Sequence, residues 1–262
     1  MPAVPRVVGS RANPLLVRLR KLAADPPSYR RLGLLLLEGD HLCAAWAACR
    51  RPVLHVLVDE AAWQLPALTP LVGAADDVLV LSDDAMRGIG SLESPPRIAF
   101  VVAVPAGNEV RAGAPTLVLD RLQDPGNVGT LIRSAAAFGF TQVVALAGTA
   151  ALWAPKVVRA GMGAHFALHL VEEAGLDVLD GLGVPLLGTS SHAARRIDGE
   201  RLPWPCAWVL GHEGQGLAAA VADRCEAMLR IGQPGGEESL NVAAAGAVCL
   251  YESARQRGGR EE

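Results

Sequence analysis

Short apolar runs alternate with helix-like stretches along the chain, and this alternation limits the fold more than any other feature. Over residues 116–231, runs of strand length are repeatedly followed by stretches with the spacing of a helix. Strands and helices that alternate in this way form a parallel sheet covered by helices. The sequence therefore predicts an α/β fold whose ligands lie at the carboxyl ends of the strands.

A segment rich in Gly, Pro and Ala interrupts the alternation. It reads PAGNEVRAGAP over Pro105–Pro115 and has no strand or helix periodicity. We therefore predict a first domain over residues 1–105, a linker over residues 106–114 and a second domain over residues 115–262.

The expected elements follow the same pattern in both domains. The expected strands are Leu34–Glu38, Leu54–Asp59, Val78–Leu81, Ile98–Val104, Thr116–Asp120, Gln142–Leu146, Ala167–Leu170, Pro185–Thr189, Ala207–Leu210 and Ala227–Ile231. The main expected helices are Asn13–Ala24, His41–Cys49, Asp83–Ile89, Val128–Phe138, Pro155–Met162, Leu176–Leu182, Leu217–Arg224 and Ser239–Arg257.

Charge is distributed unevenly along the chain. Residues 1–51 carry nine Lys and Arg against three Asp and Glu, a net charge of +6, whereas the whole chain carries −3. A basic segment on an acidic remainder is typical of proteins that bind a polyanion. A solvated helix face has the same composition, so charge alone leaves both interpretations open.

Several classes of protein are disfavoured. No apolar run reaches the roughly 18 residues that a bilayer span requires, and the first residues show no signal-peptide core. The five cysteines have no CxxC spacing and no accompanying histidines. We therefore expect no membrane segment, no metal site and no disulfide framework, and a cytoplasmic location.

The first of three notable clusters reads DPGNVGTLIRSA and begins at Asp124. Asn127 is suited to cap the following helix, and the glycines permit a close approach to the backbone. Arg133 falls on an otherwise apolar stretch, so we expect a polar or anionic partner for it. A surface arginine on an amphipathic helix is the alternative.

The second cluster, VLGHEGQGL, follows a strand and is rich in glycine. It matches neither of the standard phosphate-binding patterns, no lysine follows it, and Glu213 would repel a phosphate. A neutral or cationic ligand suits this loop better, for example the sulfonium and adenosine of S-adenosylmethionine. A plain tight turn is the alternative.

The third cluster is IGQPGGEESLNV, which begins at Ile231 and opens the last helix. Ser239 or Asn241 is placed to cap that helix. A Gly/Pro loop leaves peptide groups bare, so a ligand there would be bound by backbone atoms. We interpret the Glu237-Glu238 pair as a solvated loop edge and His192, in another turn after a strand, as a loop residue.

In this order and spacing, NxGxxxR, GxEGxG and SLNV resemble the motifs of the SpoU (TrmH-like) family of RNA 2′-O-ribose methyltransferases in the SPOUT superfamily. The resemblance covers about residues 114–257. LLLLEGDHLCAAW resembles, more loosely, a small ribosomal-protein-like α/β substrate-binding domain often fused in front. The resemblance implies a C-terminal SPOUT-type α/β domain with a deep trefoil knot, a homodimer, and S-adenosylmethionine as cofactor.

The resemblance also implies roles for particular residues. By motif position, the residues expected at the cofactor are Gly211, Ile231 and Leu240 through their backbone, with Thr189 and Ser190 nearby. The residues that match the family's functional polar positions are Asn127, Arg133, Glu213, Ser239 and Asn241.

The implied reaction is methyl transfer from S-adenosylmethionine to a ribose 2′-hydroxyl of RNA, with ribosomal RNA favoured over transfer RNA by the N-terminal extension. Arg133 stays protonated. We therefore expect it to stabilise the alkoxide and to position a phosphate, acting within its own subunit or across a dimer.

Three positions depart from the family pattern. Gly232-Gln233 stand where Pro-Met is usual, Ala160-Gly161 where serine is frequent, and His212 where a small residue is frequent. A catalytically silent RNA-binding or ribosome-assembly protein therefore stays open, as does a tRNA 2′-O-methyltransferase. A small-molecule nucleotide enzyme is disfavoured because the phosphate fingerprints fail.

Overall fold

The computed structural model describes residues 5–9, 12–25, 27–90, 94–235 and 240–258. Backbone contacts divide the chain into two compact units. Unit 1 comprises Met1–Ala106 and Trp153–Phe166, and unit 2 comprises Gly107–Leu152 and Ala167–Glu262. The chain therefore passes between the units three times.

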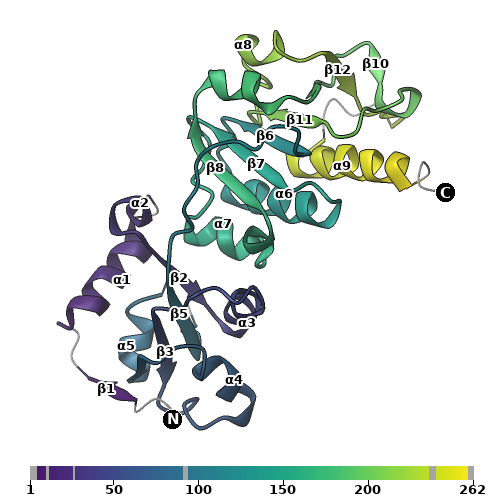
Figure 1. Cartoon of the computed structure of the whole chain (residues 1–262). Helices are drawn as coiled ribbons and strands as arrows, with labels where there is room; N and C mark the ends of the chain where they lie inside the picture. The colour runs from purple at the N-terminus through teal and green to yellow at the C-terminus, as the bar shows by residue number, and fades with distance from the viewer. Residues whose placement is uncertain (1–4, 10–11, 26, 91–93, 236–239, 259–262) are drawn as a thin grey trace. The chain divides into compact units, whose positions relative to one another are not determined.

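Unit 1 is built on a five-stranded sheet of order β1-β4-β3-β5-β2 (Figure 1). Its strands are β1 (Arg6–Val8), β2 (Leu34–Glu38), β3 (His55–Asp59), β4 (Val78–Leu81) and β5 (Ile98–Ala103). β1, β4 and β3 are parallel, whereas β5 is antiparallel to both of its neighbours. The sheet is therefore mixed, and the predicted α/β alternation of the first domain does not require its strands to be parallel.

Short helices connect the strands of unit 1. They are α1 (Pro14–Ala24), α2 (Ser28–Leu32), α3 (Asp40–Ala48), η1 (Pro66–Leu68), α4 (Thr69–Val72) and α5 (Asp83–Arg87). Asn13 caps α1, because its side chain accepts a hydrogen bond from the Leu15 N–H at 2.9 Å. Leu16, Leu19 and Leu22 form the buried stripe of this amphipathic helix.

A segment from the middle of the chain completes unit 1. It contains α7 (Pro155–Ala160) and the start of η2 (Ala164–Ala167). Phe166 meets Trp46 of α3 edge to face, with ring centroids 5.0 Å apart, and its carbonyl accepts a hydrogen bond from Arg51 at 3.0 Å. We predicted this segment as part of the second domain, and its packing on unit 1 leaves no local signal in the sequence.

Unit 2 contains a seven-stranded sheet of order β10-β12-β9-β11-β6-β7-β8 in which every pair is parallel. The strands are β6 (Thr116–Asp120), β7 (Gln142–Leu146), β8 (His169–Ala174), β9 (Leu186–Thr189), β10 (Arg195–Arg196), β11 (Ala207–Gly211) and β12 (Ala227–Arg230). The helices are α6 (Pro125–Ala137), η3 (Leu176–Leu182), η4 (Ile197–Gly199), α8 (Ala219–Ala222) and α9 (Val242–Gly258). The predicted α/β fold with a parallel sheet is confirmed here.

Helices α6 and α9 lie side by side and α9 packs on β11 (Figure 1). The approach is close because Gly246 of α9 has no side chain. A Cβ there would lie 2.3 Å from Leu131 Cδ2 and 2.6 Å from Leu210 Cδ1. Deeper in this contact, the buried Trp208 donates its Nε1–H to Ser253 Oγ at 2.9 Å. Small residues and one satisfied polar pair thus fix α9 against the central strands.

The stretch that we predicted as a linker is hydrogen-bonded to unit 2. The buried Gln142 side chain accepts from the Arg111 N–H at 2.7 Å and donates to Thr116 Oγ1 at 2.9 Å. The Asn108 side chain accepts from the Glu172 N–H at 3.0 Å and donates to the Glu172 carbonyl at 3.2 Å. Residues 107–114 therefore run along unit 2 as part of its structure.

Two further features complete the fold. The stretch Leu176–Leu182, predicted as an α-helix, is a 3₁₀ helix that ends at Gly183 with a φ of 63°. Seven residues that include Gly181 nucleate a regular α-helix poorly. Within the described residues, no helix is long and apolar enough to cross a membrane, and no group of His, Cys, Asp or Glu side chains could hold a metal ion.

Candidate active site

The site lies where parallel strands of unit 2 end. Because β6, β9, β11 and β12 are parallel neighbours, their carboxyl ends meet at one edge of the sheet. The loops that leave these ends contain the three clusters found in the sequence. The fold therefore brings together segments that are more than 100 residues apart, such as Asn127 and Asn241.

The loop after β11 folds back on itself and depends on glycine. The Gly216 N–H donates to the His212 carbonyl at 2.9 Å, and Gly216 has a φ of 66°. A Cβ on Gly211 would lie only 2.3 Å from the carbonyl carbon of Gly216 and from the nitrogen of Leu217. Any side chain at position 211 would therefore force this loop open.

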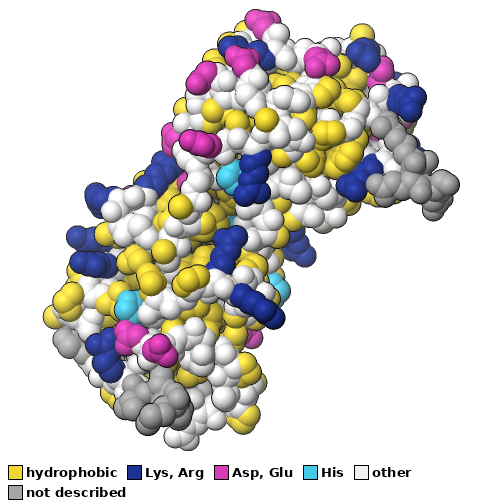
Figure 2. Space-filling view, viewed as in Figure 1, with side chains coloured by type: hydrophobic (Ala, Val, Ile, Leu, Met, Phe, Trp, Pro, Cys, Tyr) yellow, Lys and Arg dark blue, Asp and Glu magenta, His cyan; other side chains and the backbone are white. Residues whose placement is uncertain are grey.

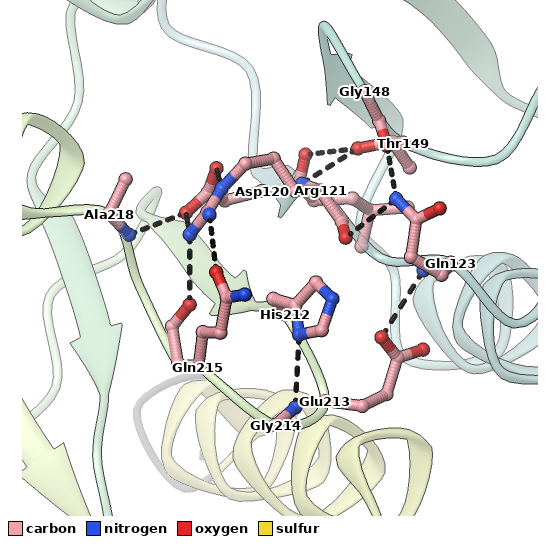
Figure 3. A network of polar contacts seen from close by, with 12 residues as sticks. Asp120, Arg121, Gln123, Gly148, Thr149, His212, Glu213, Gly214, Gln215 and Ala218 are labelled. Carbon is pink, nitrogen blue, oxygen red and sulfur yellow. Dashed lines mark hydrogen bonds and ion pairs between the residues drawn. The ribbon is translucent and has the colours of Figure 1, made fainter.

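An ion pair behind this loop fixes its position (Figure 3). Asp120, buried at the end of β6, accepts a hydrogen bond from the Ala218 N–H at 2.7 Å and from Arg121 Nε at 3.0 Å. Arg121 also donates to Gln215 Oε1 at 3.0 Å and to the Gly216 carbonyl at 3.2 Å. Its guanidinium thus ties β6 to the loop after β11, and the Asp120 side chain raises its pKa.

Glu213, at the tip of the same loop, turns toward the start of α6. Its carboxylate accepts from the backbone N–H groups of Gln123 at 3.2 Å and Asp124 at 3.1 Å, and from Asn127 Nδ2 at 3.3 Å. Partial burial raises the pKa of Glu213, but the hydrogen bonds, led by those from backbone N–H groups, lower it below its usual value. Glu213 is therefore a carboxylate at neutral pH.

Asn127 and Asn241 join two helix starts. Asn241 Nδ2 donates to Asn127 Oδ1 at 3.0 Å, while Asn241 Oδ1 accepts from the N–H groups of Ala243 and Ala244 and so caps α9. For α6 the predicted cap is wrong. Asp124 caps it by accepting from the Asn127 N–H at 2.7 Å, which leaves the Asn127 side chain available for Asn241 and Glu213.

A cavity of about 950 Å³ lies beside this chain of polar contacts. It is lined by the loops after β9, β11 and β12 and by the start of α9, and Glu213 forms part of its wall. All five residues expected at the cofactor line it: Thr189, Ser190, Gly211, Ile231 and Leu240. His192, which we interpreted as a loop residue, lines it too.

Arg133 and Ser239 complete the set of predicted polar residues. Arg133 lies on the exposed side of α6 and has no hydrogen bond or ion pair to any residue that the structure describes. The partner we expected for it is therefore not found among the described residues, and its exposed guanidinium is open to solvent. Ser239 and the Glu237-Glu238 pair lie outside the described residues.

Four residues behind the loop were not predicted from the sequence: Asp120, Arg121, Gln123 and Thr149 (Figure 3). Thr149 accepts from the Arg121 N–H at 3.0 Å and donates to the Leu119 carbonyl at 3.0 Å. Arg121 has a φ of 59°, which is unusual outside glycine. An acidic residue closing an apolar strand, followed at once by arginine, was the available signal.

Comparisons with known proteins agree with this architecture. The model of the SpoU rRNA Methylase family matches residues 114–251. The chain is 31% identical to the 23S rRNA (guanosine(2553)-2′-O)-methyltransferase RlmP of Bacillus subtilis over 82% of this chain and 86% of that protein. It is 33% identical to an uncharacterized tRNA/rRNA methyltransferase of Synechocystis over 95% of this chain and 94% of that protein.

Among solved structures, the SpoU methyltransferase AviRb from Streptomyces viridochromogenes, in complex with AdoMet, superposes with a TM-score of 0.84. The two are 27% identical, and the match covers 94% of this chain and 98% of AviRb. The similarity thus extends over both units, beyond the segment that the family model matches. The chain belongs to the SpoU rRNA methylase family.

Proposed function

We propose that this protein transfers the methyl group of S-adenosylmethionine to a ribose 2′-hydroxyl of ribosomal RNA. One observation carries the proposal: the cavity lined by strand-end loops shares Glu213 with the polar chain Asn241–Asn127–Glu213. The proposed cofactor cavity and the hydrogen-bonded side chains of Asn241, Asn127 and Glu213 thus lie next to each other at one edge of the sheet. RlmP is named for the 2′-O-methylation of a guanosine in 23S rRNA, which supports ribosomal RNA as the substrate.

The residues present fit S-adenosylmethionine. The volume of about 950 Å³ is within the range of sites for ligands of this size. Bare Gly211 and the neighbouring loops offer peptide groups to the ligand, and no lysine stands among the described residues of the lining. We assign Gly211, Ile231 and Leu240 to cofactor binding through their backbone, with Thr189 and Ser190 beside them.

When bound, S-adenosylmethionine supplies a methyl group activated by its sulfonium. The protein's own contribution is to hold the acceptor in place, since proximity and orientation supply much of the rate. Asn127 and Asn241 fix each other, and Glu213 fixes Asn127, so the polar edge of the site has one arrangement. We assign to Arg133 the stabilisation of negative charge on the 2′-oxygen, together with contact to a phosphate. Its exposed guanidinium is free to reach RNA.

Labelled methyl transfer tests the function. Purified protein, S-adenosylmethionine with a labelled methyl group, and RNA from a strain lacking the gene are combined, with ribosomal and transfer RNA in separate reactions. We expect label in ribosomal RNA, in dinucleotides that resist alkali because the 2′-oxygen is blocked. Label in transfer RNA alone would overturn the substrate. Cofactor binding without any transfer would support a silent RNA-binding protein.

We propose that unit 1 binds the RNA substrate. Exposed basic side chains gather on α1 and α2, as Figure 2 shows in the region where Figure 1 places these helices. They include Arg18 and Lys21 on α1 and Arg30 and Arg31 on α2. The logarithm of the binding constant falls linearly with the logarithm of the salt concentration. Each phosphate contact makes this slope steeper by about 0.7 to 0.9. Truncating the first domain is a poor test, because it would strip the partner surface of residues 153–166.

Charge substitution avoids that difficulty. An Arg18→Gln/Lys21→Gln double variant should bind RNA more weakly and with a salt slope reduced by about one to two. The control is Arg255→Gln on α9, which should leave the slope unchanged. Equal slopes in all three proteins would contradict RNA binding by α1.

We propose that the protein is a homodimer through the exposed face of α9. Ala244, Val248 and Tyr251 fall at helical spacing on one exposed stripe. Val248 and Tyr251 are 40% and 52% exposed, and the Tyr251 ring lies edge to face on Phe138 of α6. An apolar stripe of this kind is costly to leave in water. A Val248→Glu/Tyr251→Glu variant should be a monomer in light scattering, whereas wild-type protein should have twice that mass.

We also propose that unit 2 contains the trefoil knot that the family resemblance implies. The crossed order β10-β12-β9-β11 supports it, since the chain must cross the same sheet edge repeatedly to produce this order. Refolding of the denatured chain should accordingly be slow. Refolding as fast as that of unknotted α/β proteins of similar length would count against the knot.

A further inference from the structure

One polar atom in the cavity wall has no partner. Gln233 lines the cavity, and its Oε1 is buried without a hydrogen bond to any residue that the structure describes. A buried carbonyl oxygen that loses water and gains no donor is costly, and native proteins rarely keep one without a reason. The unpartnered oxygen therefore indicates a donor that arrives with a ligand.

Other polar side chains of the same wall are already engaged within the protein. Thr189 Oγ1 donates to the Val209 carbonyl at 3.3 Å, and Ser190 Oγ accepts from the His192 N–H at 3.2 Å. His212 Nδ1 accepts from the Gly214 N–H at 3.0 Å. Gln215 Oε1 is held by Arg121, as described above. Gln233 differs from these residues because its buried acceptor forms no hydrogen bond within the described part of the chain.

The charge around Gln233 indicates what kind of donor it can accept. The neighbouring Gly232 leaves room for the Arg196 guanidinium, since a Cβ on Gly232 would lie 2.5 Å from Arg196 Nη2. Arg230 lines the same cavity. Arg196 is paired with Asp198 at 2.7 Å, so with Arg230 these three side chains carry a net charge of +1, which disfavours a cationic donor such as an ammonium. A neutral N–H or O–H group is therefore the donor that suits this position.

We propose that Gln233 is a specificity-determining residue that accepts a hydrogen bond from a neutral donor of the cofactor's nucleoside. The inference rests on the proposed function, in which S-adenosylmethionine occupies the cavity. The nucleoside of this cofactor has two kinds of neutral donor, the 6-amino group of adenine and the ribose hydroxyls. Gln233 thereby adds a side-chain hydrogen bond to the backbone contacts that we assign to the cofactor.

Calorimetric titration with defined ligands tests the inference without any need for turnover. The probes are S-adenosylhomocysteine, S-inosylhomocysteine, which has a carbonyl in place of the 6-amino group, and the 2′-deoxy and 3′-deoxy forms of S-adenosylhomocysteine. Wild-type protein should bind one of the three altered probes about five- to tenfold more weakly than S-adenosylhomocysteine, the loss expected for one neutral hydrogen bond. The probe that shows this loss identifies the donor.

Two variants complete the test. Gln233→Met has similar length and no strong acceptor, so it should bind S-adenosylhomocysteine about five- to tenfold more weakly and lose discrimination against the same probe. Its melting temperature without ligand should be equal to or above that of wild-type, because the unsatisfied oxygen is gone. The matched control is Gln215→Met, which should melt at a lower temperature and keep the discrimination.

The outcomes separate this inference from the proposed function. If Gln233→Met keeps every affinity ratio of wild-type protein, the inference is overturned, and a lowered melting temperature would then mark Gln233 as structural. If wild-type protein binds no S-adenosylhomocysteine at all, the proposed cofactor fails and the inference fails with it. Loss of discrimination in Gln233→Met alone supports the inference.

Discussion

Asn241 Nδ2 donates to Asn127 Oδ1 across 3.0 Å and thereby connects the starts of α9 and α6. The two residues are 114 positions apart in the chain. Each performs a second task, since Asn241 caps α9 and Asn127 donates to Glu213. A change at Asn241 should therefore affect both the stability of α9 and the arrangement of the site, and the two effects can be separated.

Two substitutions of Asn241 make that separation. Asn241→Ala removes the cap and the donor and should lower the free energy of unfolding by about 1–2 kcal/mol. Asn241→Asp keeps an acceptor at the helix start and should stay within about 0.5 kcal/mol of wild-type. Both variants lose the contact with Asn127, so both should lose methyl transfer. Urea denaturation and the transfer assay measure the two effects, and an active Asn241→Asp variant would contradict a positioning role.

Gly211→Ala should disrupt the loop after β11. The added Cβ would meet the backbone of Gly216 and Leu217 at 2.3 Å, a contact that requires the loop to move. We expect a loss of about 1–3 kcal/mol of stability and of cofactor affinity. The matched control is Gly214→Ala in the same loop, where the nearest atoms belong to the His212 ring at 3.9 Å. Thermal unfolding and calorimetry compare the two, and equal effects would refute the steric explanation.

Glu213 should make stability depend on pH in the acidic range. Its pKa in the folded protein lies below the ordinary 4.5, so its contribution is complete above that value and is lost as the pH falls through the lowered pKa. Glu213→Gln should therefore be less stable than wild-type near neutral pH, by under about 1 kcal/mol because the side chain is exposed. The difference should vanish at low pH.

The measurement is urea denaturation from about pH 7 to about pH 3, a range that brackets carboxylate titration. Glu226→Gln serves as the control, because that exposed carboxylate accepts no hydrogen bond from the described residues. The difference in unfolding free energy between Glu226→Gln and wild-type should not change with pH. A flat profile for Glu213→Gln as well would mean that the backbone N–H groups do not favour the Glu213 carboxylate.

Arg121→Ala should weaken the support behind the loop. It leaves the buried Asp120 carboxylate with the Ala218 N–H and without its cation, and it frees Gln215 and the Gly216 carbonyl. We expect a lower free energy of unfolding, because the buried carboxylate keeps fewer donors. Arg255→Ala breaks an exposed pair with Glu252 and should lower the free energy of unfolding much less. Comparable losses would argue against the buried pair as the cause.

Arg133→Ala should separate activity from stability. The exposed guanidinium forms no hydrogen bond or ion pair with the described residues, so the unfolding free energy should change by less than about 0.5 kcal/mol. If Arg133 stabilises the 2′-alkoxide, methyl transfer should fall by about 10²–10³. Arg133→Lys should recover little of this, because a single ammonium does not replace the guanidinium fork. Near-normal turnover in Arg133→Ala, with RNA and cofactor bound, would exclude the role.

The sequence predicted the strands of unit 2 well because each is a buried apolar run between polar loops. β10 was missed because its two residues are exposed and lie at a sheet edge, and β1 because all three of its residues are exposed or only partly buried. The direction of β5 was also beyond the pattern, since a buried strand has the same composition whether its neighbours are parallel or antiparallel. Strand direction depends on chain path, which hydrophobic periodicity does not record.

The part of the site that could be predicted consists of residues that stand at motif positions. Five residues placed at the cofactor by motif position do line one cavity, although their contact with cofactor stays a prediction. The cap of α6 was misplaced even though Pro125, a residue favoured at the first helical position, marked Asp124 as the cap. The role of Asp120 and Arg121 could not be predicted from the sequence, because Arg121 bonds to a loop about 95 residues away along the chain.

The insertion of residues 153–166 into unit 1 has a consequence for synthesis. The Trp46 and Phe166 rings can meet only after residue 166 has left the ribosome, although the last strand of that unit ends at residue 103. At about 5–20 residues per second, unit 1 waits several seconds with part of its apolar surface uncovered. During that interval β6 and β7 are already available. The order of folding on the ribosome is therefore not the order of the units along the chain.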